Sequence, residues 1–143
     1  IETPRKYYFS DLGLRNARLR FRQFEETHAM ENLLYNELRM RGYQVDVGLV
    51  TTMEKNKSGN VQRKQLEVDF VCNLGSARYY IQSAYAIPDA EKRAQELRPL
   101  LKIGDSFRKI VVTRDPTPAY YDDNGILTMS IYDFLLDPQS LSR

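Results

Sequence analysis

The clearest hydrophobic pattern in the chain is helical and spans residues 25–41. Its apolar positions recur every three or four residues, at Met30, Leu33, Leu34 and Leu38. Such spacing places them on one face of a helix. Acidic residues occupy the first turn, and Gly42 follows the last turn, where glycine commonly ends a helix. The pattern therefore predicts a helix over 25–41.

Three later stretches alternate instead between apolar and polar residues, with a period of two. They cover about 43–49, 62–72 and 78–84, and each is typical of a half-buried strand. Only the polar loop 55–60 and the turn 73–76 separate them. Connections this short join antiparallel neighbours, so we predict a three-stranded antiparallel meander.

Beyond the meander, helix and strand signals alternate. A helix opens at Pro88–Asp89 and should be kinked or shortened by Pro99. Residues 109–113 form a β-branched run, typical of a strand that is buried on both faces. A strong turn over 122–125 leads into a short strand at 126–129.

Capping signals mark two short helices near the ends of the chain. Ser130 with Asp133 forms a capping box for a last helix, and Ser10 is the expected N-cap of a first one. With the elements between them, these helices predict an α/β domain in which helices cover the sheet.

Length and composition fit one ordinary globular domain over residues 1–143. The chain is 42% apolar and 28% charged, which excludes disordered and collagen-like classes. It has no membrane-spanning apolar stretch and no secretion signal. Its single cysteine, Cys72, excludes a disulfide framework and favours a cytoplasmic location. Because the sequence begins at Ile1 rather than Met, we expect it to be a fragment of a longer chain.

Positive charge is concentrated near the N-terminus, although the whole chain carries only +2. We divide the domain into a basic helical lead-in of about 1–23 and an α/β core of about 24–143. The lead-in offers four candidates for contacting nucleic-acid phosphates: Arg15, Arg18, Arg20 and Arg22. A series of this kind is more often a solvated surface.

Acidic residues suggest a second kind of site. Glu67 and Asp69 are two residues apart and project from one face of their strand. Glu31 lies at the border of the apolar stripe on the long helix. If the three converge, their oxygens suit Mg²⁺. In the alternative interpretation, Glu67 and Asp69 are the solvated face of a strand, and Glu31 lies on the helix surface.

The order of these residues resembles the PD-(D/E)XK, or restriction-endonuclease-like, fold. More specifically, the chain is similar to the C-terminal domain of unknown function that follows the ATPase module in many prokaryotic AAA+-type ATPases. The phrases that carry the resemblance are KYYFSDLGLRN at 6–16, ENLLYNEL at 31–38, EVDFV at 67–71, YIQSAY at 80–85, Gly125–Ile126 and DFLL at 133–136.

The resemblance assigns roles residue by residue. Glu31 matches the helix acid of the nuclease motif and Asp69 its first metal-binding acid, which makes them the candidate pair for Mg²⁺. Gln82 stands where the motif has its second acid, and Ala84 where it has its lysine. An amide oxygen can still face a cation, but alanine can supply neither charge nor a proton. The resemblance thus implies a mixed sheet flanked by helices and argues against catalysis.

Three hypotheses about function follow. The first is a non-catalytic nuclease-like module with a binding or regulatory role, joined to the ATPase module of the same chain. Its binding partner would be that ATPase module, another protein or nucleic acid. ATP would then bind the missing parent module, because no Gly-rich phosphate loop is present here. The second is a cryptic Mg²⁺-dependent nuclease using Glu31 and Asp69, with a displaced lysine such as Lys64. The third is nucleic-acid binding through Arg15–Arg22 without cleavage.

Overall fold

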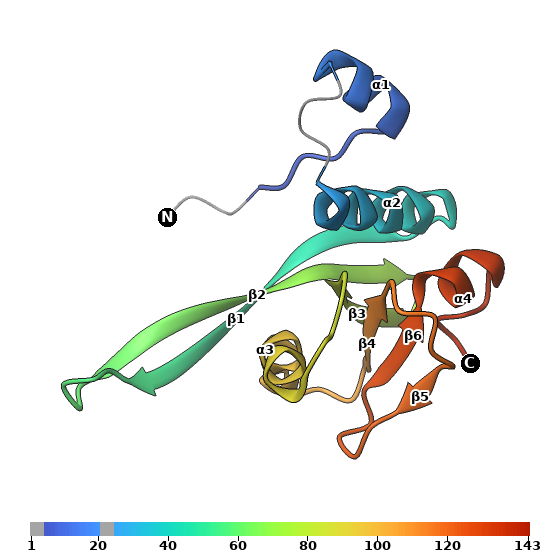
Figure 1. Cartoon of the computed structure of the whole chain (residues 1–143). Helices are drawn as coiled ribbons and strands as arrows, with labels where there is room; N and C mark the ends of the chain where they lie inside the picture. Colours follow the sequence, from blue (N-terminus) through green and yellow to red (C-terminus); the bar gives the residue numbers. More distant parts are fainter. Residues whose placement is uncertain (1–4, 21–24) are drawn as a thin grey trace.

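The computed structural model describes residues 5–20 and 25–143, which form a mixed sheet flanked by helices (Figure 1). The helices are α1 (Leu12–Arg18), α2 (Glu26–Met40), α3 (Ala90–Leu101) and α4 (Ile131–Leu136). The strands are β1 (Gln44–Lys55), β2 (Val61–Leu74), β3 (Ala77–Ala84), β4 (Arg108–Thr113), β5 (Tyr120–Tyr121) and β6 (Leu127–Ser130).

Within this described part of the chain, the strands form one sheet in the order β1-β2-β3-β4-β6-β5. The first three are antiparallel, as the short connections predicted. β3, β4 and β6 then run parallel to one another, and β5 pairs antiparallel with β6 at the edge. The α/β class and the antiparallel start of the sheet are therefore confirmed.

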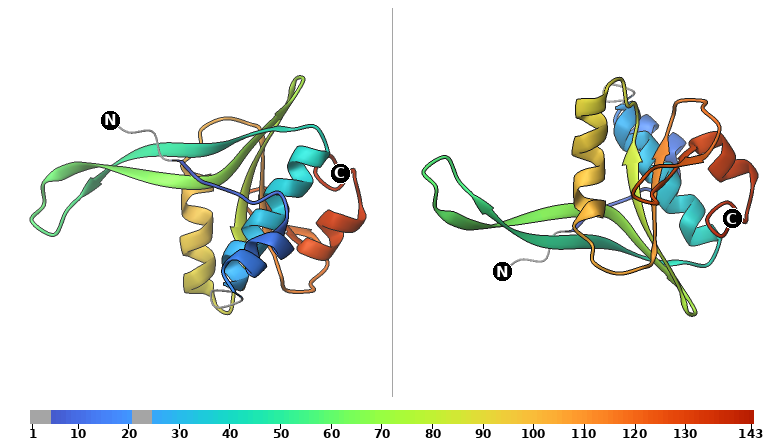
Figure 2. Two further views of the ribbon diagram at one scale, coloured as in Figure 1. Left: turned by 90° about the horizontal axis from the view of Figure 1, so that it is seen from above. Right: turned by 90° about the horizontal axis from the view of Figure 1, so that it is seen from below.

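Helices cover both faces of the sheet, so there are two apolar layers (Figures 1 and 2). On one face, Leu34 and Leu38 of α2 and Phe134 of α4 pack in a cluster with Ile110. On the other, residues of α3 pack against Val111. Neighbouring β4 residues enter opposite layers, and the prediction of a strand buried on both faces is confirmed.

The first helix begins one residue later than predicted. Its N-cap is Asp11, whose side chain accepts a hydrogen bond from the Leu14 amide. The prediction of Ser10 as the cap is therefore wrong. Aspartate is as good a cap as serine, because its carboxylate also suits the positive end of the helix. α3 continues past Pro99 and ends two residues later at Leu101.

The β1–β2 hairpin is longer than the alternating pattern indicated. β2 pairs with β3 only over Phe70–Leu74, so the earlier part of β2 pairs with β1 alone. The end of the hairpin projects from the body of the protein (Figures 1 and 2). We call residues 51–65 the hairpin arm.

Gly48 lies at an irregularity in the β1–β2 register, where the two strands come close together. A Cβ there would lie 2.8 Å from Val71 Cγ2 and 3.0 Å from Val68 Cβ. We expect Gly48→Ala to lower the free energy of unfolding by about 1–2 kcal/mol, because β2 must shift to make room. Gly104→Ala is the control, since its Cβ would meet no atom within 4 Å. Equal urea midpoints for the two variants would contradict the expectation.

Candidate functional site

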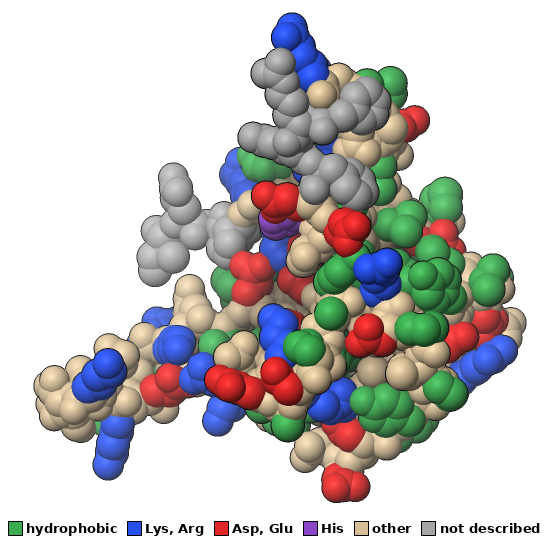
Figure 3. All heavy atoms as spheres, in the orientation of Figure 1, with side chains coloured by type: hydrophobic (Ala, Val, Ile, Leu, Met, Phe, Trp, Pro, Cys, Tyr) green, Lys and Arg blue, Asp and Glu red, His purple; other side chains and the backbone are tan. Residues whose placement is uncertain are grey.

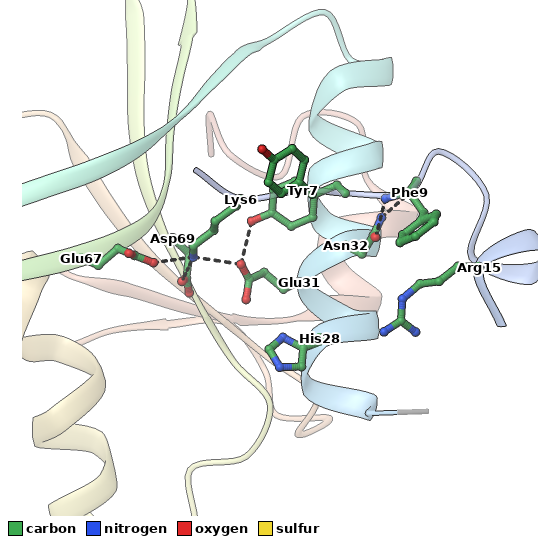
Figure 4. A pocket seen from close by; sticks show the side chains of 10 residues that line it. Lys6, Tyr7, Phe9, Arg15, His28, Glu31, Asn32, Glu67 and Asp69 are labelled. Atoms are coloured by element: carbon green, nitrogen blue, oxygen red, sulfur yellow. Dashed lines mark hydrogen bonds and ion pairs between the residues drawn. The ribbon is translucent and has the colours of Figure 1, made fainter. Parts of the chain in front are cut away.

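A pocket of about 560 Å³ lies between the N-terminal segment, the first half of α2 and β2 (Figure 4). Glu31 enters it from α2, whereas Glu67 and Asp69 enter it from β2. Side chains from two elements far apart in sequence therefore converge, as the acidic pattern suggested.

The three carboxylates surround the ammonium of Lys6. Its Nζ lies 3.0 Å from Glu31 Oε1, 2.7 Å from Glu67 Oε1 and 2.9 Å from Asp69 Oδ1 (Figure 4). Glu31 and Asp69 are largely shielded from water, with side chains 16% and 14% exposed. The interpretation of both as solvent-facing residues is therefore wrong, because the N-terminal segment covers them. A single cation of the chain itself lies at the centre of the acidic cluster.

Lys6 was not among the residues predicted for the site. It stands in the KYYF phrase, but no periodicity linked it to acids 25 and 63 positions away. Lys64, the lysine proposed for a nuclease, lies elsewhere. Its Nζ is 3.8 Å from Glu54 Oε2, on the hairpin arm.

Tyr8 supports Glu31 from the same segment. Its hydroxyl donates a hydrogen bond of 2.7 Å to Glu31 Oε1, and its ring stacks on Tyr35 with centroids 4.3 Å apart. Burial and the neighbouring Glu31 carboxylate raise the pKa of Tyr8 well above its ordinary value. The hydroxyl therefore stays protonated and acts as a donor.

A buried amide fixes the segment that carries Lys6 and Tyr8. Asn32 of α2 accepts a hydrogen bond of 2.9 Å from the Phe9 amide and donates one of 2.7 Å to the Phe9 carbonyl. Asn36, one turn later, donates a further bond of 2.9 Å to that carbonyl. Because the amide and the carbonyl of Phe9 are both hydrogen-bonded to α2, these bonds position Lys6 in addition to its own ion pairs.

The pKa values of Asp69 and Lys6 reflect their mutual contact. Burial raises the pKa of Asp69, as does the Glu31 carboxylate, while Lys6 acts in the opposite direction. Burial by itself lowers the pKa of Lys6, but hydrogen bonds to Glu67, Asp69 and Glu31 raise it overall. The cluster thus contains three carboxyl groups but only one ammonium, and all three contact it.

Asp69 also ties two strands together. Its Oδ2 accepts a hydrogen bond of 2.9 Å from the Ser83 amide, at a point where the β2–β3 ladder has ended. Gln82 lies opposite, and its Oε1 accepts a bond of 3.2 Å from the Asp69 amide. The side-chain amide of Gln82 also approaches Glu96 Oε2 at 3.4 Å. Gln82 thus contacts the backbone of Asp69.

Ala84, the remaining position of the nuclease motif, lies apart from the cluster. Ala84 is 2% exposed and packs with Leu97 and Leu100 of α3. Within the described residues, no set of three or more Asp, Glu, His or Cys side chains is arranged to hold a metal ion. His28 lines the same pocket as Glu31, but it is exposed and its Nε2 lies 2.9 Å from Glu25 (Figure 4).

The basic lead-in is short and partly engaged. Arg15 donates to Asn16 and lies over the Phe9 ring, whereas Arg18 and Arg20 are exposed. Arg22 lies outside the described residues. In the part of the chain that the structure describes, no helix is long and apolar enough to cross a membrane.

Comparison with known proteins gives one informative match. An uncharacterized protein of Haemophilus influenzae is 30% identical over 139 residues, which make up 95% of this chain and 30% of the relative. The chain thus spans less than a third of the length of the curated relative it matches. No family profile matches the sequence, and no solved structure matches it.

Proposed function

We propose that this chain is a non-catalytic, nuclease-like module of the PD-(D/E)XK type, joined to a prokaryotic AAA+-type ATPase in the cytoplasm. Its role is to bind or regulate rather than to cleave. The resemblance of its phrases supplies the class, and the greater length of the Haemophilus protein is compatible with further modules.

The observation that carries the proposal is the place of the Lys6 ammonium among Glu31, Glu67 and Asp69. In a metal-dependent nuclease the carboxylates must be free to bind a divalent cation, which activates water and stabilises the developing charge. Here a tethered cation already contacts all three. Carboxylates paired in this way attach the N-terminal segment to the body of the fold, because each contact joins that segment to α2 or β2.

The residues beside Asp69 support the same conclusion. Gln82 directs its oxygen to a backbone amide, and Ala84 is enclosed by α3. Losing one well-placed electrostatic group costs an enzyme about 10²–10³ in rate. These residues therefore support the fold rather than catalysis, and we infer that another surface of the module binds the partner.

The test is a cleavage assay with DNA and RNA in millimolar Mg²⁺ or Mn²⁺, together with calorimetric titration of each metal. We expect no cleavage and no heat of binding, because Lys6 already occupies the carboxylates. Asp123→Ala, in an exposed turn, is the matched control for Asp69→Ala. Cleavage that Asp69→Ala abolishes and Asp123→Ala preserves would overturn the proposal.

Lys6 also favours a second candidate, the Mg²⁺-dependent nuclease using Glu31 and Asp69. Its ammonium lies 2.9 Å from Asp69 and could play the part of the lysine in the nuclease motif, which is to stabilise negative charge beside the metal-binding acid. In this alternative Lys6, rather than Lys64, orients water beside a bound metal. Lys6→Met separates the two functions: it abolishes cleavage by a nuclease, but it frees the carboxylates of a non-catalytic module for metal.

A further inference from the structure

The hairpin arm has a net positive charge, whereas the rest of the chain taken together has a net charge of −1. Residues 51–65 contain four basic side chains and one acid, a net charge of +3, against +2 for the whole protein. Figure 3 shows these basic side chains along the projecting arm. The acid, Glu54, is bound by Arg98 of α3 and lies 3.8 Å from Lys64. The arm thus presents cations to its surroundings.

Strand register divides the arm into a covered and an open face. The covered face contains Thr52, which is buried, and Glu54, which Arg98 holds. Side chains directly opposite in an antiparallel pair share a face. The open face therefore consists of the pairs Thr51 with Gln65, Met53 with Arg63, and Lys55 with Val61.

Every side chain of the open face is exposed. Met53 is 66% and Val61 is 59% exposed, and each stands directly across from a cation. Lys55, Arg63 and Lys57 at the tip make no ion pair with any residue the structure describes. This face therefore has free positive charge without compensating acid.

The mixture of residues identifies the kind of partner. The centres of protein–protein interfaces are depleted in charge, whereas on this face two of the three cross-strand pairs place a cation opposite an apolar residue and the third is neutral and polar. Lysine, arginine, threonine and glutamine are all donors suited to phosphates. A two-stranded ribbon also fits the B-DNA major groove, about 12 Å wide, but not the deep, narrow major groove of duplex RNA.

We propose that the hairpin arm binds duplex DNA, with its open face in the major groove and Lys55, Lys57 and Arg63 against phosphates. The proposal is independent of whether the carboxylate cluster is active. It also differs from binding through the Arg15–Arg22 segment, because it places the contact on β1 and β2.

The test is fluorescence anisotropy with a short duplex DNA in low salt and EDTA, which prevents metal-dependent cleavage. The arm variant replaces Lys55, Lys57 and Arg63 by glutamine. Its control replaces Arg15, Arg18 and Arg20 by glutamine, which removes the same charge from the lead-in. We expect the arm variant to bind at least about tenfold more weakly, with the slope of log K against log salt reduced by about 0.9 per lost contact.

Several results would overturn the proposal. One is the absence of duplex binding by the unaltered chain at low salt. Another is a loss in the arm variant no larger than in the lead-in variant, which would show that the arm is not the preferred contact. Equal affinity for duplex DNA and duplex RNA would exclude entry into the major groove. Because the three arm residues are exposed, an unchanged thermal midpoint verifies that the variant is folded.

Discussion

Replacing Lys6 by methionine is expected to lower the free energy of unfolding by about 3 kcal/mol near pH 8. The substitution leaves Glu31, Glu67 and Asp69 facing one another without a cation, and two of these side chains are at least 84% shielded. Uncompensated charges in such surroundings are among the costliest single changes in a protein. Urea unfolding followed by circular dichroism measures the loss.

The loss should shrink as the solution is acidified. The Asp69 pKa is already raised by burial and by Glu31, and removing Lys6 takes away the charge that opposes this rise. A carboxyl with a higher pKa in the folded state binds protons more readily when folded, so its protonation stabilises the fold as pH falls through that range. We therefore expect a smaller difference from the unaltered chain near pH 5 than near pH 8.

Lys92→Met is the matched control. Lys92 pairs with Glu96 at 2.6 Å, but its side chain is 44% exposed, so its removal should cost less than about 1 kcal/mol at either pH. In the proposed non-catalytic module, millimolar Mg²⁺ should stabilise the Lys6 variant and leave the unaltered chain unchanged. A pH-independent loss would show that the ion pairs contribute little and that Lys6 acts through packing.

The second large effect is expected from Asn32→Ala. Asn32 is 4% exposed and satisfies both the amide and the carbonyl of Phe9. The Phe9 amide then loses its acceptor, and the Phe9 carbonyl keeps only the bond from Asn36, which should cost about 2–3 kcal/mol in total. We expect the loss to appear mainly as detachment of the segment around Phe9, because the sheet and its two apolar layers do not depend on this amide.

Hydrogen exchange measures this detachment residue by residue. The Phe9 amide should lose protection, whereas Val111 in the central strand should keep it. Asn36→Ala is the control, since it removes one of the two donors to the Phe9 carbonyl but leaves the amide bonded. Full protection of Phe9 in the Asn32 variant would show that the aromatic contacts of Tyr8 suffice to hold the segment.

The parts of the fold that could be predicted are those with strong periodicity. The apolar stripe of α2, the alternation of the meander and the β-branched run of β4 each bury a continuous face, and burial imposes a repeat on the sequence. The hairpin arm was predicted too short for the same reason. Along Thr51 to Glu54 the buried face contains the polar Thr52 and Glu54 and the exposed face contains the apolar Met53, so no hydrophobic alternation marks this stretch as strand. β5 has only two residues, both exposed, and it carries no signal at all.

The sequence predicted the acidic residues of the site but not its lysine, Lys6. Glu31 and Asp69 stand on regular elements, so their directions follow from helical and strand geometry. Lys6 precedes the first helix, and its position depends on Asn32 holding Phe9 and on Tyr8 stacking on Tyr35. Such tertiary contacts leave no repeat in the sequence. The three free cations of the arm were likewise visible only once strand register had separated two faces.

Because the ammonium of Lys6 is part of the chain, it competes for the carboxylates differently from a metal ion in solution. A bound metal ion leaves whenever its free concentration falls, and a chelator removes it. Lys6 cannot diffuse away, so its effective concentration at the carboxylates is set by the chain and by the Phe9 anchor. Lys6 therefore stays beside the carboxylates whatever the concentration of free metal ions, as long as the N-terminal segment keeps its place.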